Sequence, residues 1–287
     1  MRIKRFLRFF SFISLCLSLL FVPYPGYAEQ RPVIVIPIKG EIDAGQAALV
    51  QRAYHEAQNR NAQAVLMEID TFGGAVDAAV QIRDVVIDSS LETIVYIKNR
   101  AWSAGALISL AHKHIAIAPG GSIGAAEPIP TTEKTIAALK AEFAATASKT
   151  GRNARVAEAM VDKSLGYPGY AEPGKILALI DYQAKEVGYA DLIASERATV
   201  LAHYSLGEAP VIEHVLGWQE KAAGLLSNPT VKSLLLTVIF LAVMTEIKTA
   251  GMGVAAIVGL IAAGLFFGSQ WITGLAGWLE ILLFLFG

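Results

Sequence analysis

The middle of the chain alternates between short apolar runs and segments whose apolar residues recur every three or four positions. The apolar runs predict strands at residues 33–38, 64–69, 93–97 and 114–118. The periodic segments predict helices at residues 45–58, 76–88, 103–111 and 134–149. Strands separated by helices of this length form βαβ units around a mostly parallel sheet. The pattern therefore predicts an α/β fold for residues 29–200.

The first 28 residues have a different pattern. They contain four basic and no acidic residues, followed by an apolar run over residues 9–22 and small residues at Gly26 and Ala28. This order is typical of a secretory signal peptide, with cleavage after Ala28. The alternative is an anchor helix that is not cleaved.

The end of the chain is apolar over residues 234–244, 250–268 and 271–287. A helix needs about 20 apolar residues to cross a bilayer, so we predict transmembrane helices within residues 229–287. Because the sequence ends within an apolar stretch, we expect a C-terminal portion beyond Gly287.

These segments predict a topology. A signal peptide would export residues 29–200 across the cytoplasmic membrane, and residues 201–228 would be the linker to the first span. We therefore expect the folded domain to be extracytoplasmic and anchored in the membrane.

The composition excludes some classes of function. The chain is 54% hydrophobic and 17% charged with a net charge of −1, and it has no basic stripe that could neutralise phosphates, which argues against a nucleic-acid partner. The one cysteine, Cys16, lies in the predicted signal peptide and excludes a disulfide framework or a cysteine-rich zinc site. We expect no metal and no other cofactor.

The loops that follow predicted strands are where such sheets do chemistry. The second predicted strand leads into Phe72, Gly73 and Gly74. Two adjacent glycines expose backbone N–H groups, as an oxyanion hole requires. The alternative is a plain tight turn.

The third predicted strand leads into Trp102 and Ser103. Ser103 stands between small residues at a helix start, where its hydroxyl is a candidate nucleophile; alone, it would be read as an N-cap serine. Phe72, Trp102 and Ile123 are candidates for an apolar substrate subsite, and each is equally suited to the core.

A serine nucleophile needs a base. No histidine lies between His114 and His203, which leaves lysine, provided that its neutral amine is populated. Lys134 stands at the start of a predicted helix, and Lys140 and Lys149 follow on that helix. The residues alone leave the choice between them open.

Several ordered motifs resemble one known family. They are the runs at residues 102–111, 115–120, 122–129, 151–153, 157–161 and 184–191. They are similar to the NfeD family, a group of membrane-anchored, ClpP-class serine peptidases related to signal peptide peptidase A. The resemblance covers about residues 31–195 and the trailing spans.

The resemblance implies a ClpP/crotonase-like βαβ domain in which Ser103 is the nucleophile. Its spacing to Gly151-Arg152-Asn153 implies that Lys134 is the base, and Lys140 is the alternative. It also implies a peptide or protein substrate and a stomatin- or flotillin-like membrane partner. We further expect a homo-oligomer, a dimer or larger.

Three functions are compatible with these features. The first is a membrane-anchored Ser-Lys endopeptidase that cleaves apolar segments of membrane-associated proteins. The second is a catalytically silent membrane scaffold that binds such a partner. The third, acyl-thioester chemistry on a crotonase fold, is disfavoured by the lack of a well-placed pair of glutamates and by the predicted export.

Overall fold

The computed structural model describes residues 31–249 and 253–272. The predicted signal peptide and most of the third predicted span lie outside these residues. Ten strands and helices form the first half of the domain: β1 (Val33–Ile42), α2 (Ala44–Asn59), β2 (Ala64–Gly74), α3 (Val76–Ile87), β3 (Glu92–Trp102), α4 (Ala104–Leu110), β4 (His114–Ile117), β5 (Ser122–Gly124), α5 (Glu133–Lys149) and α6 (Ala154–Val161).

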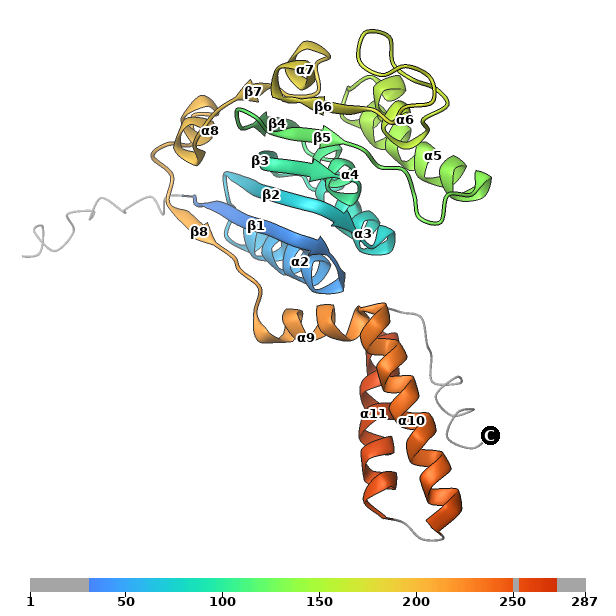
Figure 1. The fold of residues 1–287 in the computed structure, drawn as a ribbon. Helices are drawn as coiled ribbons and strands as arrows, with labels where there is room; N and C mark the ends of the chain where they lie inside the picture. Colours follow the sequence, from blue (N-terminus) through green and yellow to red (C-terminus); the bar gives the residue numbers. More distant parts are fainter. Residues whose placement is uncertain (1–30, 250–252, 273–287) are drawn as a thin grey trace, which may run out of the picture. The chain divides into compact units, whose positions relative to one another are not determined.

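The second half is made of shorter elements and ends in long helices. They are β6 (Ala178–Ile180), α7 (Asp181–Glu186), β7 (Leu192–Ile193), α8 (Arg197–His203), β8 (Val211–Glu213), α9 (Trp218–Ser227), α10 (Pro229–Thr249) and α11 (Val254–Ile272). The described strands form one sheet in the order β6-β5-β3-β2-β1-β8, and β4 and β7 extend it beside β3 (Figure 1). All pairings are parallel except that of β5 with β6.

Successive residues of the central strands alternate between two buried layers. Ile34 and Val65 pack into the larger layer, which contains the side chains of α2, α3 and α4. Val35 and Leu66 pack into the smaller layer, which includes side chains of α8. Because both faces are covered, the strands are continuously apolar, as in other parallel sheets. The predicted α/β fold is confirmed.

Two central strands run further than their apolar runs predicted. β2 continues to Gly74 and β3 continues to Trp102, where we expected them to end near residues 69 and 97. A register shift between Lys39 and Glu41 of β1 keeps the last residues of β2 paired with β1. Backbone pairing, rather than side-chain polarity, sets these strand ends, so the glycines at 73 and 74 belong to a strand and not to a free loop.

Residues 201–228, expected to be a linker, contain ordered structure. β8 pairs with β1 at the edge of the sheet, through Val33 and Val211 among others. α9 packs against α2, where Glu220 forms an ion pair with Arg52 at 2.6 Å. These residues therefore continue the folded domain up to the start of α10.

The C-terminal helices agree with a membrane domain. Among the described residues, one helix segment, Pro229–Lys248, is long and apolar enough to cross a membrane, and the apolar part of α11, Val254–Gly268, is shorter. A Cβ added to Gly259 of α11 would lie only 2.7 Å from the Cβ of Ala242 of α10. The small residues Ala242 and Gly259 thus bring the two helices into close contact.

Candidate active site

Ser103 lies between β3 and α4, at the carboxyl edge of the sheet. Its φ of 51° is unusual for a residue with a side chain. Its N–H donates a hydrogen bond to the carbonyl of Gly124 at 3.0 Å, which ties this sharp turn to the end of β5. Such a strained strand-to-helix turn is the backbone arrangement that presents the serine nucleophile of α/β-hydrolases.

Gly73 packs directly against Ser103. A Cβ at Gly73 would lie 2.6 Å from the Cβ of Ser103 and 3.1 Å from its Oγ, and the φ of Gly73 is +118°. The structure therefore brings together the predicted glycine segment and the predicted nucleophile, and it explains why a side chain is excluded at Gly73.

The N–H of Gly73 already has a partner. It donates to the Oγ1 of Thr71 at 2.9 Å, and that hydroxyl donates to the carbonyl of Gly40 at 2.5 Å. We expected a bare N–H here, but the strand extension places the Thr71 hydroxyl beneath it. Thr71 is thus a site residue that the sequence did not reveal, because its role depends on the register between β1 and β2.

Two other glycines keep this region compact. A Cβ at Gly74 would lie 2.2 Å from the carbonyl oxygen of Ile42, and one at Gly105 would lie 2.5 Å from the Cγ2 of Thr71. Next to the nucleophile, the N–H of Ala104 has no hydrogen-bond acceptor within the described chain. Small residues therefore let β1, β2 and the start of α4 approach closely around Ser103.

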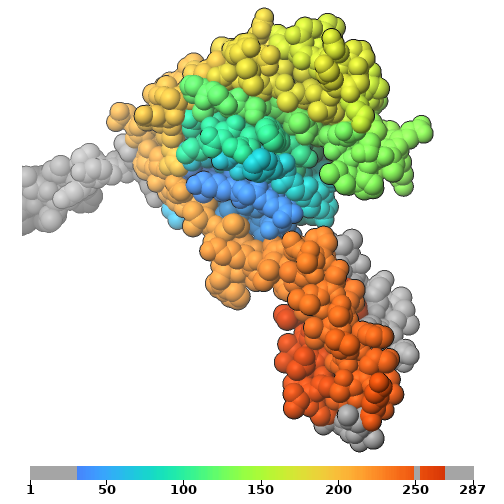
Figure 2. All heavy atoms as spheres, viewed as in Figure 1, coloured from blue at the N-terminus to red at the C-terminus, as the bar shows by residue number. Residues whose placement is uncertain are grey.

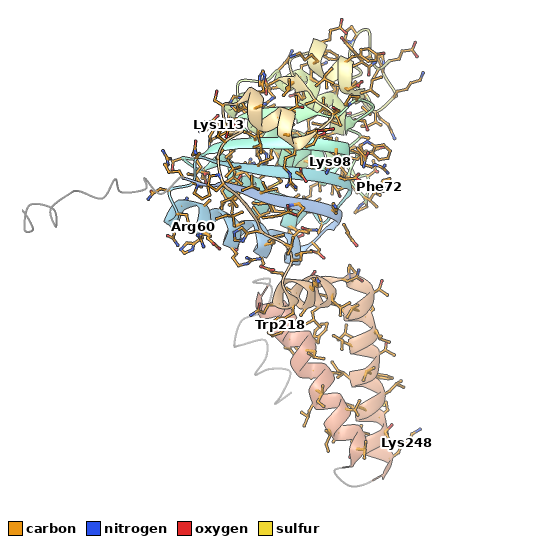
Figure 3. All side chains as sticks on the ribbon, turned by 90° about the vertical axis from the view of Figure 1, so that its left-hand side faces the viewer. Arg60, Phe72, Lys98, Lys113, Trp218 and Lys248 are labelled. Carbon is orange, nitrogen blue, oxygen red and sulfur yellow. The ribbon has the colours of Figure 1, made fainter. Side chains whose placement is uncertain are left out.

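An aromatic pair lies beside the nucleophile. The rings of Phe72 and Trp102 meet edge to face with centroids 5.4 Å apart. Phe72, labelled in Figure 3, lies at the surface and is 66% exposed. The Arg100 guanidinium lies 4.5 Å from the Phe72 ring centroid and forms an ion pair with Asp70 at 3.3 Å. A cation near the face of an aromatic ring is stabilised by its electrons, and Arg100 lies near both rings. The exposed Phe72 and the half-buried Trp102 and Arg100 therefore form one platform.

The third predicted subsite residue lies elsewhere. Ile123 is 1% exposed and belongs to the larger buried layer. Its neighbour Ser122 does reach the platform, because its Oγ accepts a hydrogen bond from Trp102 Nε1 at 2.8 Å. Ile123 therefore belongs to the core and is not exposed to a substrate.

Lys134 is exposed in the first turn of α5. Thr132 and Thr135 form a reciprocal capping box that begins the helix at Glu133. In residues 31–249 and 253–272, the Lys134 side chain makes no hydrogen bond or ion pair, and so none with Ser103. The structure thus brings Ser103 and Gly73 together but shows no hydrogen bond between Ser103 and the predicted base.

The alternative lysines are engaged in ion pairs. Lys140 donates to Asp162 at 2.7 Å, and this hydrogen bond, with another from Ser164, holds the pKa of Asp162 at about 2. Lys149 pairs with Asp88 at 3.0 Å. Either lysine would have to break its ion pair before it could act at Ser103.

The histidines near the nucleophile have structural roles. His112 is fully buried at the end of α4 and shares a hydrogen bond with the Ile108 carbonyl at 2.9 Å, and burial lowers its pKa to about 3. His114 lies 2.6 Å from Glu92.

Arg152 fastens the far end of α4. Its side chain donates to the carbonyls of His112 at 2.8 Å and Lys113 at 3.1 Å. This explains the arginine of the Gly151-Arg152-Asn153 motif as a clamp on the helix that carries Ser103.

In the described part of the chain, no group of three His, Cys, Asp or Glu residues could hold a metal ion.

Two family models match the chain. Residues 32–214 match the NfeD1b N-terminal domain, and residues 230–287 match the NfeD integral membrane domain. The chain belongs to the NfeD family. The integral membrane domain and the apolar α10 identify it as a membrane protein.

Two curated relatives cover most of this NfeD-family chain. It is 34% identical over 277 residues to "Membrane protein NfeD1b" of Bacillus subtilis (strain 168), which spans 94% of the chain. It is 29% identical over 262 residues to "Membrane-bound protease PH1510" of Pyrococcus horikoshii, which spans 85% of the chain. The chain covers 63% and 59% of the lengths of these two relatives.

Solved structures resemble the α/β domain. A serine-to-alanine mutant of the 1510-N membrane-bound stomatin-specific protease has a TM-score of 0.58 and 26% identity, over 66% of this chain and 99% of that one. A lysine-to-alanine mutant of the same protease, in complex with a substrate peptide, has a TM-score of 0.57 and 25% identity, over 67% and 95%.

Proposed function

We propose that the protein is a membrane-anchored endopeptidase with a Ser-Lys dyad. The observation that carries the proposal is the strained turn at Ser103, packed against Gly73 at the carboxyl edge of the sheet. The similar stomatin-specific protease, solved as serine-to-alanine and lysine-to-alanine mutants, supports the same pair of residue types.

The proposed reaction uses three parts of the site. The Ser103 Oγ attacks the peptide carbonyl carbon, while the neutral amine of Lys134 accepts the hydroxyl proton and later delivers it to the leaving amine. Backbone N–H groups of Gly73 and Gly74 stabilise the negative oxygen. Water then hydrolyses the acyl-enzyme and restores the Ser103 hydroxyl.

The proposed chemistry requires two local changes on substrate binding. Lys134 must approach Ser103, and the Gly73 N–H must exchange the Thr71 hydroxyl for the substrate oxygen. Catalytic hydrogen bonds are often incomplete without substrate. An exposed and unpaired Lys134 is free to move, whereas Lys140 would first have to break its ion pair with Asp162.

The platform of Phe72, Trp102 and Arg100 fits an apolar substrate segment. The exposed Phe72 ring, packed on the half-buried Trp102 next to Ser103, offers apolar surface that would be desolvated by an aliphatic or aromatic side chain. The specificity named for the similar protease makes a stomatin-like membrane protein the proposed partner, with a flotillin-like protein as the alternative. Homo-oligomer formation stays a prediction.

The test is peptide cleavage by the full chain in detergent. Apolar peptides should be cut by the wild type and not by Ser103→Ala, while Ser148→Ala, an exposed serine on α5, should cut at the wild-type rate. Equal cleavage by Ser103→Ala and wild type would exclude Ser103 as the nucleophile.

A scaffold function is the second candidate. It is favoured by the absence of a hydrogen bond between Ser103 and Lys134 in the described residues. If the wild type cuts no apolar peptide yet captures a stomatin-like protein, and Ser103→Ala captures it equally well, the scaffold function holds.

We also propose that the α/β domain lies outside the cytoplasm, on the basis of the signal-like N-terminus and the first span at α10. Alkaline phosphatase fused after Asn228 should be active. An inactive fusion, together with an active cytoplasmic reporter at the same site, would reverse this topology.

A further inference from the structure

Helix α9 has two faces of different character. Glu220 and Gly224 are buried against the α/β domain, whereas Trp218 is 75% exposed and Leu225 is 62% exposed (Figure 3). A helix with one face docked and an apolar face outward needs a partner for the outer face.

The inner face of α9 is held closely. Both Nε and Nη2 of Arg52 donate to the Glu220 carboxylate, at 2.6 and 3.2 Å. A Cβ at Gly45 would lie 2.2 Å from the Glu220 carbonyl oxygen, and one at Gly224 would lie 2.3 Å from an Asp43 carboxylate oxygen. α9 packs against α2, and in Figure 2 its surface borders the blue surface of the domain. The orientation of α9 on the domain is therefore fixed.

The outer face of α9 is an apolar stripe. Trp218, Ala222, Leu225 and Leu226 recur at the spacing of one helix face. Lys221 borders this stripe and is exposed. An apolar stripe that contains tryptophan and is bordered by lysine is typical of a helix lying at the surface of a bilayer.

The chain itself indicates what covers this stripe. α9 ends at Ser227, and the membrane-spanning segment begins at Pro229. Residues this close to the start of a span lie at the depth of the lipid headgroups, where tryptophan is enriched. We propose that the outer face of α9, Trp218, Ala222, Leu225 and Leu226, lies in the headgroup region of the bilayer, so that α9 fixes how the α/β domain meets the membrane.

A series of contacts joins this helix to the candidate active site. Asp43, which packs against Gly224 of α9, caps the start of α2 directly after Ile42. The Ile42 carbonyl accepts a hydrogen bond from Ala75 at 2.8 Å and packs against Gly74. The carboxyl edge of the sheet that holds Ser103 is thus attached at β1 to the helix that enters the membrane.

This placement of α9 predicts a substrate class for the proposed function. Resting on the proposed endopeptidase activity, it implies that peptide bonds close to a bilayer surface are cut in preference to the same bonds in free solution. Holding the reacting groups at the level of the substrate raises their effective concentration.

The depth of α9 is measured with spin labels on the full chain in phosphatidylcholine vesicles. A Cys16→Ser background receives Leu225→Cys on the outer face or Gln58→Cys, an exposed control on α2. Relaxation by oxygen, which concentrates in lipid, is compared with relaxation by a water-soluble nickel chelate. The label at 225 should be relaxed more by oxygen, and the label at 58 more by nickel.

Two results would overturn the proposal. A label at 225 relaxed mainly by nickel would place the stripe in water. A label at 225 protected from both reagents would show that protein, such as a second copy of the chain, covers it. The Ser103→Ala variant should give the same depths, so the measurement does not depend on proteolytic activity.

The substrate class is tested by one apolar peptide presented in two ways, free and attached to the vesicle through an acyl chain. The wild type should cut the attached form faster, and Trp218→Glu should reduce this preference by at least about threefold while cutting the free peptide normally. An unchanged preference in Trp218→Glu would refute the role of α9. Failure to cut either peptide would refute the endopeptidase function and leave the depth result standing.

Discussion

The two halves of the proposed dyad are built very differently. Ser103 lies in a strained turn that is tied to Gly124 and packed against Gly73. Lys134 is exposed in the first turn of α5 and has no polar partner in the part of the chain that the structure describes. If the proposed dyad is correct, Ser103 is a rigid nucleophile that Lys134 joins only with substrate. Changes near Ser103 should then alter both folding and activity, and changes at Lys134 should alter activity alone.

The largest effect on activity is expected from Gly73→Ala. Its Cβ would lie 2.6 Å from the Ser103 Cβ, so the turn or the glycine strand must shift, and peptide cleavage should fall by about 100-fold or more. The control is Gly188→Ala, directly after α7, at a φ of +75° with open space around it. It carries a similar backbone strain without the collision and should keep its activity. Wild-type cleavage by Gly73→Ala would contradict the rigid nucleophile.

The clamp on α4 predicts a large effect on stability. Arg152→Met removes the donors to the carbonyls of His112 and Lys113 and should lower the free energy of unfolding by about 2–4 kcal/mol. Urea unfolding, followed by the signal of the α/β domain, measures it. Arg155→Met, at an exposed ion pair on α6, should change it by less than about 0.5 kcal/mol. Equal losses of stability in the two variants would show that Arg152 does not clamp α4.

The buried His112 predicts how stability depends on pH. Burial lowers its pKa from 6.5 to about 3, so below pH 6.5 the unfolded chain binds a proton that the folded chain excludes. Stability from this group is complete above pH 6.5 and should fall by about 1.4 kcal/mol per pH unit as the pH drops toward 4. His112→Asn should flatten this slope in urea unfolding, and His55→Asn, on the surface of α2, should not. An unchanged slope in His112→Asn would show that other groups cause it.

The turn at Ser103 was predictable from sequence because its signals are local. Ser103 follows an apolar strand and stands among small residues, which indicates a tight strand-to-helix turn. The roles of Thr71 and Arg100 were not predictable. They depend on how far β2 and β3 remain paired beyond their apolar runs, and polar residues such as Asp70 and Asn99 hide that extension.

The same distinction applies to the rest of the fold. The βαβ order and the helices α2 and α3 follow from the periodicity of apolar residues. In contrast, β8 is three residues long and pairs with β1, which lies far away in the sequence. Its residues therefore resembled a linker. The role of Gly224 in α9 is visible only in the folded chain, where Asp43 at the start of α2 packs against it.

The central claim is that Lys134 activates Ser103 without stabilising the fold. The most direct measurement is the rate at which a fluorophosphonate labels Ser103 in the full chain, followed by mass spectrometry. Lys134→Ala should slow labelling by about 100-fold or more and leave unfolding unchanged, while Lys140→Ala should label nearly as fast as the wild type. Slow labelling in Lys140→Ala with normal labelling in Lys134→Ala would assign the base to Lys140, and normal labelling in both would contradict the Ser-Lys dyad.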